Sequence, residues 1–360
     1  MRKRQKLSRH PVRGFFLLLL ISLIVLFFYL FFDGLYLTNQ AVNLFRLHRT
    51  TANIDKLILS DIDPSTKDFL LLTQDIKKFA IEQLGLKDTP NYNTFIDTER
   101  TYLVDVVSAV RSDSLLRYER TYPLVGKVFY KGFFQPEQAQ RFAAHLQKRG
   151  YDVHVRKVSA YSSLGYLRDP LYSYMVHYDV HRLAELLIHE QVHSTIWIPG
   201  HNTFNEELAT FIGREGASAY IRHTYGADSP LLAKLRDTQQ DYATITALFS
   251  ELHAELESQY SQTPDITSRL EIKTAMISAA KNHFIQNYDQ LFLTPNYRGL
   301  QDIEWNHALI DVYVKYGGDL SDYYRLNELI GGDIRSTLEM MRSFKENPKT
   351  ELRAVLRSLS

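Results

Sequence analysis

Residues 183–211, LAELLIHEQVHSTIWIPGHNTFNEELATF, decide how this chain folds around its most reactive side chains. The stretch contains the pattern H-E-x-x-H, at His189, Glu190 and His193, and two adjacent glutamates further on, Glu206 and Glu207. Positions four apart lie on one face of an α-helix, so both histidines can bind one ion. The glutamate between them can reach a water molecule bound to that ion, which is the arrangement found in zinc peptidases.

The residues around the pattern predict a buried helix over about 179–197. The segment LAELLI, immediately before His189, is apolar except for Glu185. Buried histidines and carboxylates need partners, and a metal ion provides them. The competing interpretation is a solvated helix face with two histidines that bind nothing.

A third ligand is expected from the residues after the Pro-Gly turn at 199–200. A second helix, predicted over about 203–224, would fold back and bring Glu206 toward the histidines. Glu207 is rotated by about 100° on the same helix, so only one of the two glutamates is expected to bind. His201 is the rival ligand, but the glycine of the three-histidine pattern H-E-x-x-H-x-x-G-x-x-H is missing before it. The sequence favours Glu206.

The composition limits the chemistry further. The chain has 360 residues, of which 45% are hydrophobic and 23% charged, as is typical of globular proteins. Cysteine is absent, which excludes disulfides, thiolate ligands and a cysteine nucleophile. Histidine and carboxylate ligands suit zinc. The net charge of +1 gives no basic surface for nucleic acid.

The N-terminus predicts a membrane anchor. Residues 1–13 carry six Lys and Arg and no acid, and the following FFLLLLISLIVLFFYLFF, residues 15–32, has no charge. As a helix this run would span about 27 Å, close to the thickness of a bilayer core. We expect an uncleaved transmembrane signal anchor over 14–33, with residues 1–13 in the cytoplasm. A cleaved signal peptide is the alternative, although it would need a shorter apolar run and a small-residue cleavage site.

The remaining pattern predicts a mainly α (α+β) fold in one domain, residues 34–360. Residues 34–120 are expected to be helical, and 121–160 to form a strand, a helix and a strand. Apolar residues at helical spacing on both sides of Pro264 predict a long helical hairpin over about 229–290. Residues 301–357 add two or three helices.

Four residues are weaker candidates for substrate binding. Tyr161, Ser162 and Gly165 follow the second predicted strand, where an exposed edge could pair with an extended peptide. A simple turn is an equal alternative there. Tyr313 could donate a hydrogen bond to a developing oxyanion, although a packing role is commoner for tyrosine.

The motifs resemble those of a bacterial family of predicted aminopeptidases of the glutamate-zincin type. HEQVH and NEELA are similar to the H-E-x-x-H and N-E-x-x-A motifs, and AYSSLGYLRDPLYS and FNEELATFIGREG resemble longer segments of the family. The resemblance covers most of the chain after the predicted anchor. It implies a zincin-like metallopeptidase fold with Zn²⁺ bound by His189, His193 and Glu206, and with Glu190 as the general base.

The expected protein is therefore a membrane-anchored zinc-dependent peptidase whose domain lies outside the bacterial inner membrane, in the periplasm or beyond. Its expected partners are a peptide substrate and the lipid bilayer, and not nucleic acid. The aminopeptidase activity rests on the resemblance alone. The alternative is a membrane-anchored peptide-binding or scaffold protein with a structural or degenerate zinc site, but such a site has no need of Glu190 as a base.

Overall fold

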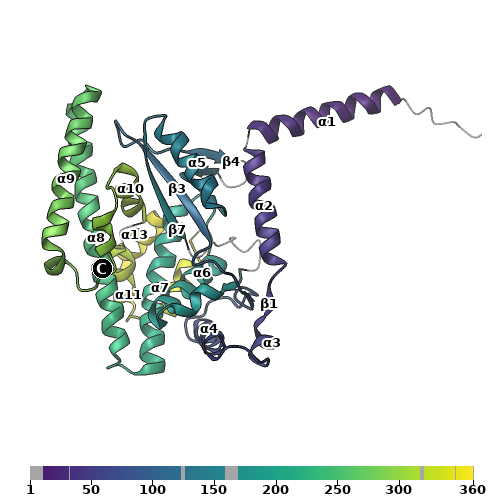
Figure 1. The fold of residues 1–360 in the computed structure, drawn as a ribbon. Helices are drawn as coiled ribbons and strands as arrows, with labels where there is room; N and C mark the ends of the chain where they lie inside the picture. The colour runs from purple at the N-terminus through teal and green to yellow at the C-terminus, as the bar shows by residue number, and fades with distance from the viewer. Residues whose placement is uncertain are drawn as a thin grey trace, which may run out of the picture.

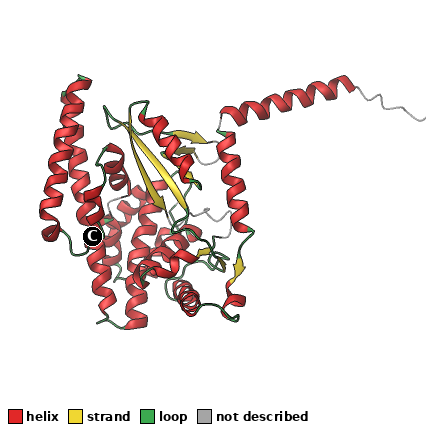
Figure 2. Ribbon diagram, in the orientation of Figure 1, coloured by secondary structure: helices red, strands yellow, loops and turns green. Residues whose placement is uncertain are grey.

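The computed structural model describes residues 11–31, 33–122, 126–158, 169–316, 320–344 and 346–359. The fold is mainly helical with small sheets, as predicted (Figure 1, Figure 2). The N-terminal part consists of α1 (Pro11–Phe31), α2 (Gly34–His48), α3 (Ile54–Ile58) and α4 (Pro64–Glu82). Short strands β1 (Ala52–Asn53), β2 (Thr94–Ile96) and β8 (Leu171–Tyr172) form one small sheet, and β4 (Arg120–Tyr122) pairs with β5 (Gly126–Val128).

A three-stranded antiparallel sheet lies beside the helices. Its order is β6 (Tyr130–Phe133), β3 (Val104–Arg111) and β7 (Tyr151–Val158). β3 pairs with β7 along its whole length, from Val104 opposite Val158 to Arg111 opposite Tyr151. α5 (Pro136–Gln147) connects β6 to β7 and packs on one face of the sheet. The predicted strand, helix and strand within 121–160 are thereby confirmed.

The prediction that residues 34–120 are all helical is wrong for the central strand. β3 is buried at every position from Val104 to Val110, on both faces of the sheet. Such a strand shows no alternation of apolar and polar residues, so its sequence reads like a buried helix. The valines at 104, 106, 107 and 110 are β-branched, which favours the strand.

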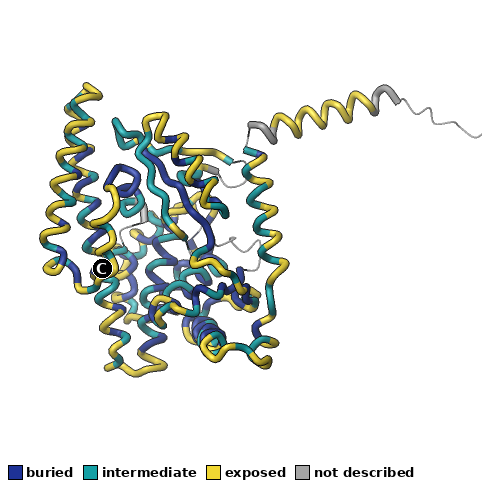
Figure 3. Tube along the Cα trace, viewed as in Figure 1, coloured by how far each residue is buried: buried dark blue, intermediate teal, exposed yellow. Residues whose placement is uncertain are grey.

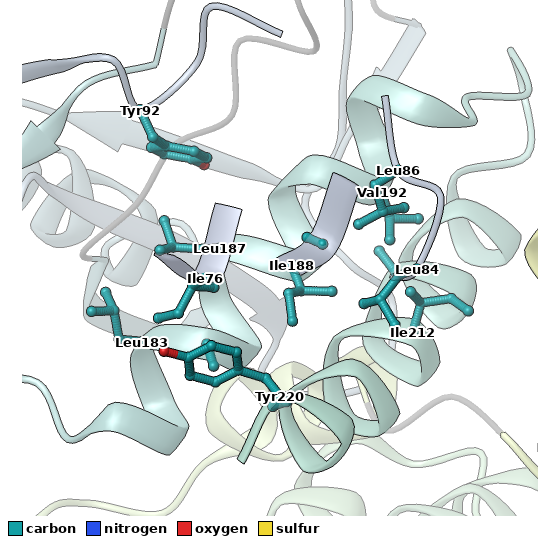
Figure 4. Close-up of a cluster of buried hydrophobic side chains, with 14 of the residues drawn as sticks. Ile76, Leu84, Leu86, Tyr92, Leu183, Leu187, Ile188, Val192, Ile212 and Tyr220 are labelled. Atoms are coloured by element: carbon teal, nitrogen blue, oxygen red, sulfur yellow. The ribbon is translucent and has the colours of Figure 1, made fainter. Parts of the chain in front are cut away.

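The main hydrophobic core is centred on α6 (Val180–Thr195) and α7 (Asn202–Tyr225), which confirms both helices predicted from the motif region. Figure 4 shows side chains of α6, α7 and α4 meeting in one cluster. The buried residues of α6 recur at spacings of three and four, so one face is apolar and another is free to carry polar groups. The side chains labelled in that cluster include Ile76, Leu183, Leu187, Ile188, Val192, Ile212 and Tyr220.

The predicted helical hairpin at 229–290 is also confirmed. It consists of α8 (Pro230–Gln262) and α9 (Ile266–Leu291), and α10 (His307–Tyr316) packs against it around Phe249, Phe284 and Trp305. α11 (Ser321–Leu329), α12 (Ile334–Met341) and α13 (Pro348–Leu359) follow, so the described part of 301–357 holds four α-helices rather than two or three. Two 3-10 turns, Ser173–His177 and Arg298–Asp302, complete the described elements.

The N-terminal helix α1 points away from the rest of the chain, and its described side chains, at 15–27, are exposed (Figure 1, Figure 3). No helix in the described ranges is both long enough and apolar enough to span a membrane. The transmembrane segment predicted over 14–33 stays a prediction from the sequence.

Candidate metal centre

The two histidines of the motif lie one turn apart on α6 and point to the same place. The Nε2 atoms of His189 and His193 are 3.2 Å apart, and their rings are nearly perpendicular, at 86°. Both nitrogens carry lone pairs when the rings are neutral, so they converge as two ligands would. This is the geometry that the i, i+4 spacing predicts.

Glu206, near the start of α7, completes the group. Its Oε2 lies 3.7 Å from Nε2 of His189, and its Oε1 lies 3.6 Å from Nε2 of His193. Among the residues that the structure describes, these form the only group of three or more histidine and carboxylate side chains close enough to share an ion. Zinc with ligand bonds of about 2.0–2.1 Å separates tetrahedral ligand atoms by about 3.3–3.4 Å. The observed spacings fit that size.

The group is enclosed on one side and open on the other. The side chain of His193 is 4% exposed, that of His189 is 22% exposed and that of Glu206 is 44% exposed. Structural zinc sites are closed by four protein ligands, whereas catalytic sites keep a position for water or substrate. Three converging ligands with an accessible side correspond to the second type.

The charges around the histidines favour a cation at the position between the two rings. Burial and the neighbouring His189 lower the pKa of His193 to about 4, so this ring is neutral at pH 7. Burial lowers the pKa of His189 as well, but Glu206, Glu190 and Glu185 together raise it above its ordinary value. The three carboxylates thus make the position between the rings attractive to a cation.

Glu190 lies on α6 next to His189 and is partly buried. Its charge acts on Tyr92, a buried tyrosine whose pKa is raised by burial and then by the charges of Glu190 and Asp169. The backbone of Tyr92 is left-handed, with φ of 59°, which costs a bulky residue of order 1–3 kcal/mol. Sequence reasoning missed Tyr92, because its backbone conformation and its neighbours depend on the tertiary fold.

The loop containing Tyr92 is tied to the rest of the protein by several polar contacts. Lys77 of α4 donates to the carbonyls of Thr89 and Asn91, and the Asn91 side chain donates to Ser194 at the end of α6. The backbone N–H of Tyr92 donates to the carbonyl of Asp169 at 2.7 Å. These bonds offset the backbone strain and hold the loop against the motif helix.

Asn205 explains how the short connection between α6 and α7 brings Glu206 back to the histidines. Its side chain accepts a hydrogen bond from the N–H of Ile198 at 3.0 Å and donates to the carbonyl of Ile198 at 2.9 Å. These two hydrogen bonds join the start of α7 to the connection that precedes it and so stabilise the turn. Trp197, in the same connection, packs against the ring of His193. The asparagine of the N-E pair is thus structural, while the glutamate faces the site.

The other sequence candidates lie elsewhere. His201 precedes α7 and is not part of the group, and Glu207 points away from it toward α11 and α13. Tyr313 packs between Phe249 and Tyr297 in the hydrophobic cluster of the hairpin. The substrate role given to Tyr313 stays a prediction. Tyr161, Ser162 and Gly165 lie outside the described residues.

Comparison with known proteins places the site in a family context. The model of a family described as "Putative aminopeptidase" matches residues 35–356, which is most of the chain and includes every residue of the site. No curated protein matches the sequence, and no solved structure matches it. The chain therefore belongs to this aminopeptidase family.

Proposed function

We propose that this protein is a zinc-dependent aminopeptidase of the glutamate-zincin type. Family membership supports peptide hydrolysis as the activity. The proposal of a bound metal rests on one observation. His189, His193 and Glu206 converge at spacings suited to zinc, with one side open to solvent. When bound, zinc would polarise the scissile carbonyl and make a water molecule more acidic.

Each side chain then has one task. His189 and His193 bind through Nε2, and Glu206 binds through its carboxylate. Glu190 accepts a proton from the attacking water and later donates it to the leaving amine. A carboxylate in this position suits both transfers, because it lies beside the ligands without being one of them.

The test compares the full-length wild type with Glu190→Gln and His189→Ala. We expect about one bound zinc in wild type and in Glu190→Gln, and loss of zinc in His189→Ala. Hydrolysis should fall by about 10²–10⁴-fold in Glu190→Gln, which is the usual contribution of a general base. Zinc bound without any hydrolysis in wild type would favour the scaffold alternative instead.

A pair of matched peptides tests the exopeptidase part of the proposal. One peptide has a free N-terminus and the other is acetylated, with the same sequence otherwise. We expect release of the first amino acid from the free peptide only. Cleavage of both peptides at an internal bond would leave a zinc peptidase but contradict the aminopeptidase assignment.

The membrane location stays a prediction from the sequence. It rests on the six basic residues of 1–13 and the uncharged run at 15–32. We propose a bacterial inner-membrane protein whose peptidase domain lies on the periplasmic or extracellular side. Alkaline extraction of membranes from cells that produce the full chain tests it. Release of the protein into the soluble fraction would contradict the anchor.

A further inference from the structure

Glu207, the neighbour of the candidate ligand Glu206, has a buried carboxylate with two distant partners. The residue is 5% exposed. The hydroxyl of Tyr323 on α11 donates to its Oε2 at 3.1 Å, and Nζ of Lys349 on α13 donates to its Oε1 at 2.8 Å. Each oxygen is thus held by a different C-terminal helix.

The ring of Tyr323 also contacts α7 on both sides of Glu206. Its centroid lies 5.9 Å from that of Phe204 and 6.0 Å from that of Phe211. With 3.6 residues per turn, Phe204, Glu207 and Phe211 lie on one face of α7, and Glu206 is turned about 100° from Glu207. The C-terminal helices therefore contact one face of α7, and Glu206 projects from a different face of the same segment.

The contact of Glu207 with Tyr323 and Lys349 also compensates a buried charge. A buried carboxylate is costly unless it is paired and hydrogen-bonded. α7 can keep its present rotation at low cost only while Tyr323 and Lys349 are in place. Lys349 is the weaker tie, because its side chain is 41% exposed, whereas Tyr323 is 1% exposed. Loss of α13 from this surface would leave the Glu207 charge poorly compensated, and α7 could then turn Glu207 toward water.

We propose that Tyr323, Glu207 and Lys349 couple the docking of the C-terminal helix α13 to metal binding at Glu206. With α13 docked, Glu207 is held, and Glu206 faces His189 and His193. By linkage, a bound metal must stabilise the docking of α13 by the same amount. This coupling rests on the metal site of the proposed function, and Tyr323 and Lys349 act as positioning residues.

The first experiment measures zinc affinity by competition with a chromophoric chelator, using the full chain. Lys349→Met should weaken zinc binding by about 10- to 100-fold, the usual effect of losing a group that orients a ligand. The matched control is Arg353→Met on the same helix. Arg353 forms an exposed pair with Asp322, at 3.2 Å, and such pairs contribute little to stability, so its loss should leave affinity close to that of wild type. Lys349→Arg, which keeps the charge, should restore most of the affinity.

The second readout is hydrogen exchange of the amides at 348–359, with and without zinc. Zinc should slow exchange there in wild type and in Arg353→Met, and much less in Lys349→Met. A purely structural lysine would lower thermal stability without changing this zinc dependence. Should Lys349→Met not fold, Lys349→Gln serves instead, because it removes the charge that compensates Glu207 but can still donate a hydrogen bond to it, and it should also weaken zinc binding.

The outcomes separate this proposal from the previous one. If both Lys349→Met and Lys349→Gln bind zinc as tightly as wild type, the coupling is overturned and the peptidase proposal stays intact. Absence of zinc binding in wild type would overturn both. Weaker binding in Lys349→Met together with zinc-dependent protection of 348–359 in wild type would support the coupling.

Discussion

Gly213 of α7 lies against His189 of α6 so closely that a β-carbon added to it would sit 3.1 Å from Cβ of the histidine. The same added atom would lie 3.1 Å from the backbone carbonyl oxygen of Glu185. Neither neighbour can move alone, because one is helix backbone and the other is attached directly to it. The absence of a side chain at Gly213 thus sets how closely the two helices of the metal centre approach.

We predict that Gly213→Ala weakens zinc binding about tenfold and lowers the free energy of unfolding by about 1–3 kcal/mol, as overpacking usually does. The methyl group would push α7, and Glu206 with it, away from the histidines. Gly216→Ala is the control on the same helix. The three atoms nearest to its β-carbon would be side-chain methyl carbons of Leu84 and Ile188, at 2.9 to 3.1 Å, and not backbone atoms of α6. It should lower stability but preserve zinc affinity, and equal affinity loss in both variants would contradict this account.

The choice between the two possible third ligands is directly testable. Glu206→Ala should remove bound zinc, whereas His201→Ala should keep close to one zinc per chain by elemental analysis. Zinc at 100 times its dissociation constant should raise the free energy of unfolding of the wild type by about 2.7 kcal/mol relative to the metal-free chain. That gain should disappear in Glu206→Ala. Zinc retained in Glu206→Ala and lost in His201→Ala would reverse the assignment.

Acid should destabilise the fold partly through His154 of β7. Burial and the nearby Arg156 lower the pKa of His154 from 6.5 to about 4. The unfolded chain therefore binds this proton at higher pH than the folded chain. The stability contributed by neutral His154 is complete above about pH 6.5 and is lost as the pH falls toward 4, by up to about 1.4 kcal/mol per pH unit.

His154→Gln should therefore flatten the pH dependence of the unfolding free energy between about pH 6.5 and 4. Urea unfolding at several pH values measures it. His283→Gln, at an exposed position on α9, is the control and should leave the slope as in wild type. An unchanged slope in His154→Gln would mean that other groups account for the acid sensitivity.

Asp33 should stabilise the junction between α2 and the sheet. Its carboxylate binds Arg120 at 3.1 Å and Lys131 at 2.7 Å, and the side chain of Lys131 is only 7% exposed. Asp33→Asn keeps a residue that tolerates the left-handed backbone there, φ 56°, but leaves the lysine charge uncompensated. In thermal unfolding, the free energy of unfolding of Asp33→Asn should be lower than that of wild type by about 1–3 kcal/mol.

The control is Asp289→Asn. Asp289 pairs with Arg298 on the surface, and its side chain is 81% exposed, so this pair should contribute less than about 1 kcal/mol. Equal losses in Asp33→Asn and Asp289→Asn would show that burial at the junction adds nothing.

Local sequence patterns were sufficient for the features that depend on spacing within one element. The pair His189 and His193 follows from four-residue spacing on a helix, and the hairpin of α8 and α9 follows from apolar repeats on both sides of Pro264. β3 was misassigned because Val104 to Val110 is buried on both faces, which removes the alternation that identifies a strand.

The rest was decided by contacts between residues far apart in the chain. Spacing alone left His201 and Glu206 open as third ligands, and only the packing of α7 on α6 brings Glu206 within 3.7 Å of both histidines. The partners of Glu207 lie 116 and 142 residues away, at Tyr323 and Lys349. A sequence specifies which groups can bind a metal, because that depends on side-chain chemistry and helical spacing. Their orientation depends on which buried charges and close-packed glycines the whole fold can accommodate, and that was decided by the tertiary structure.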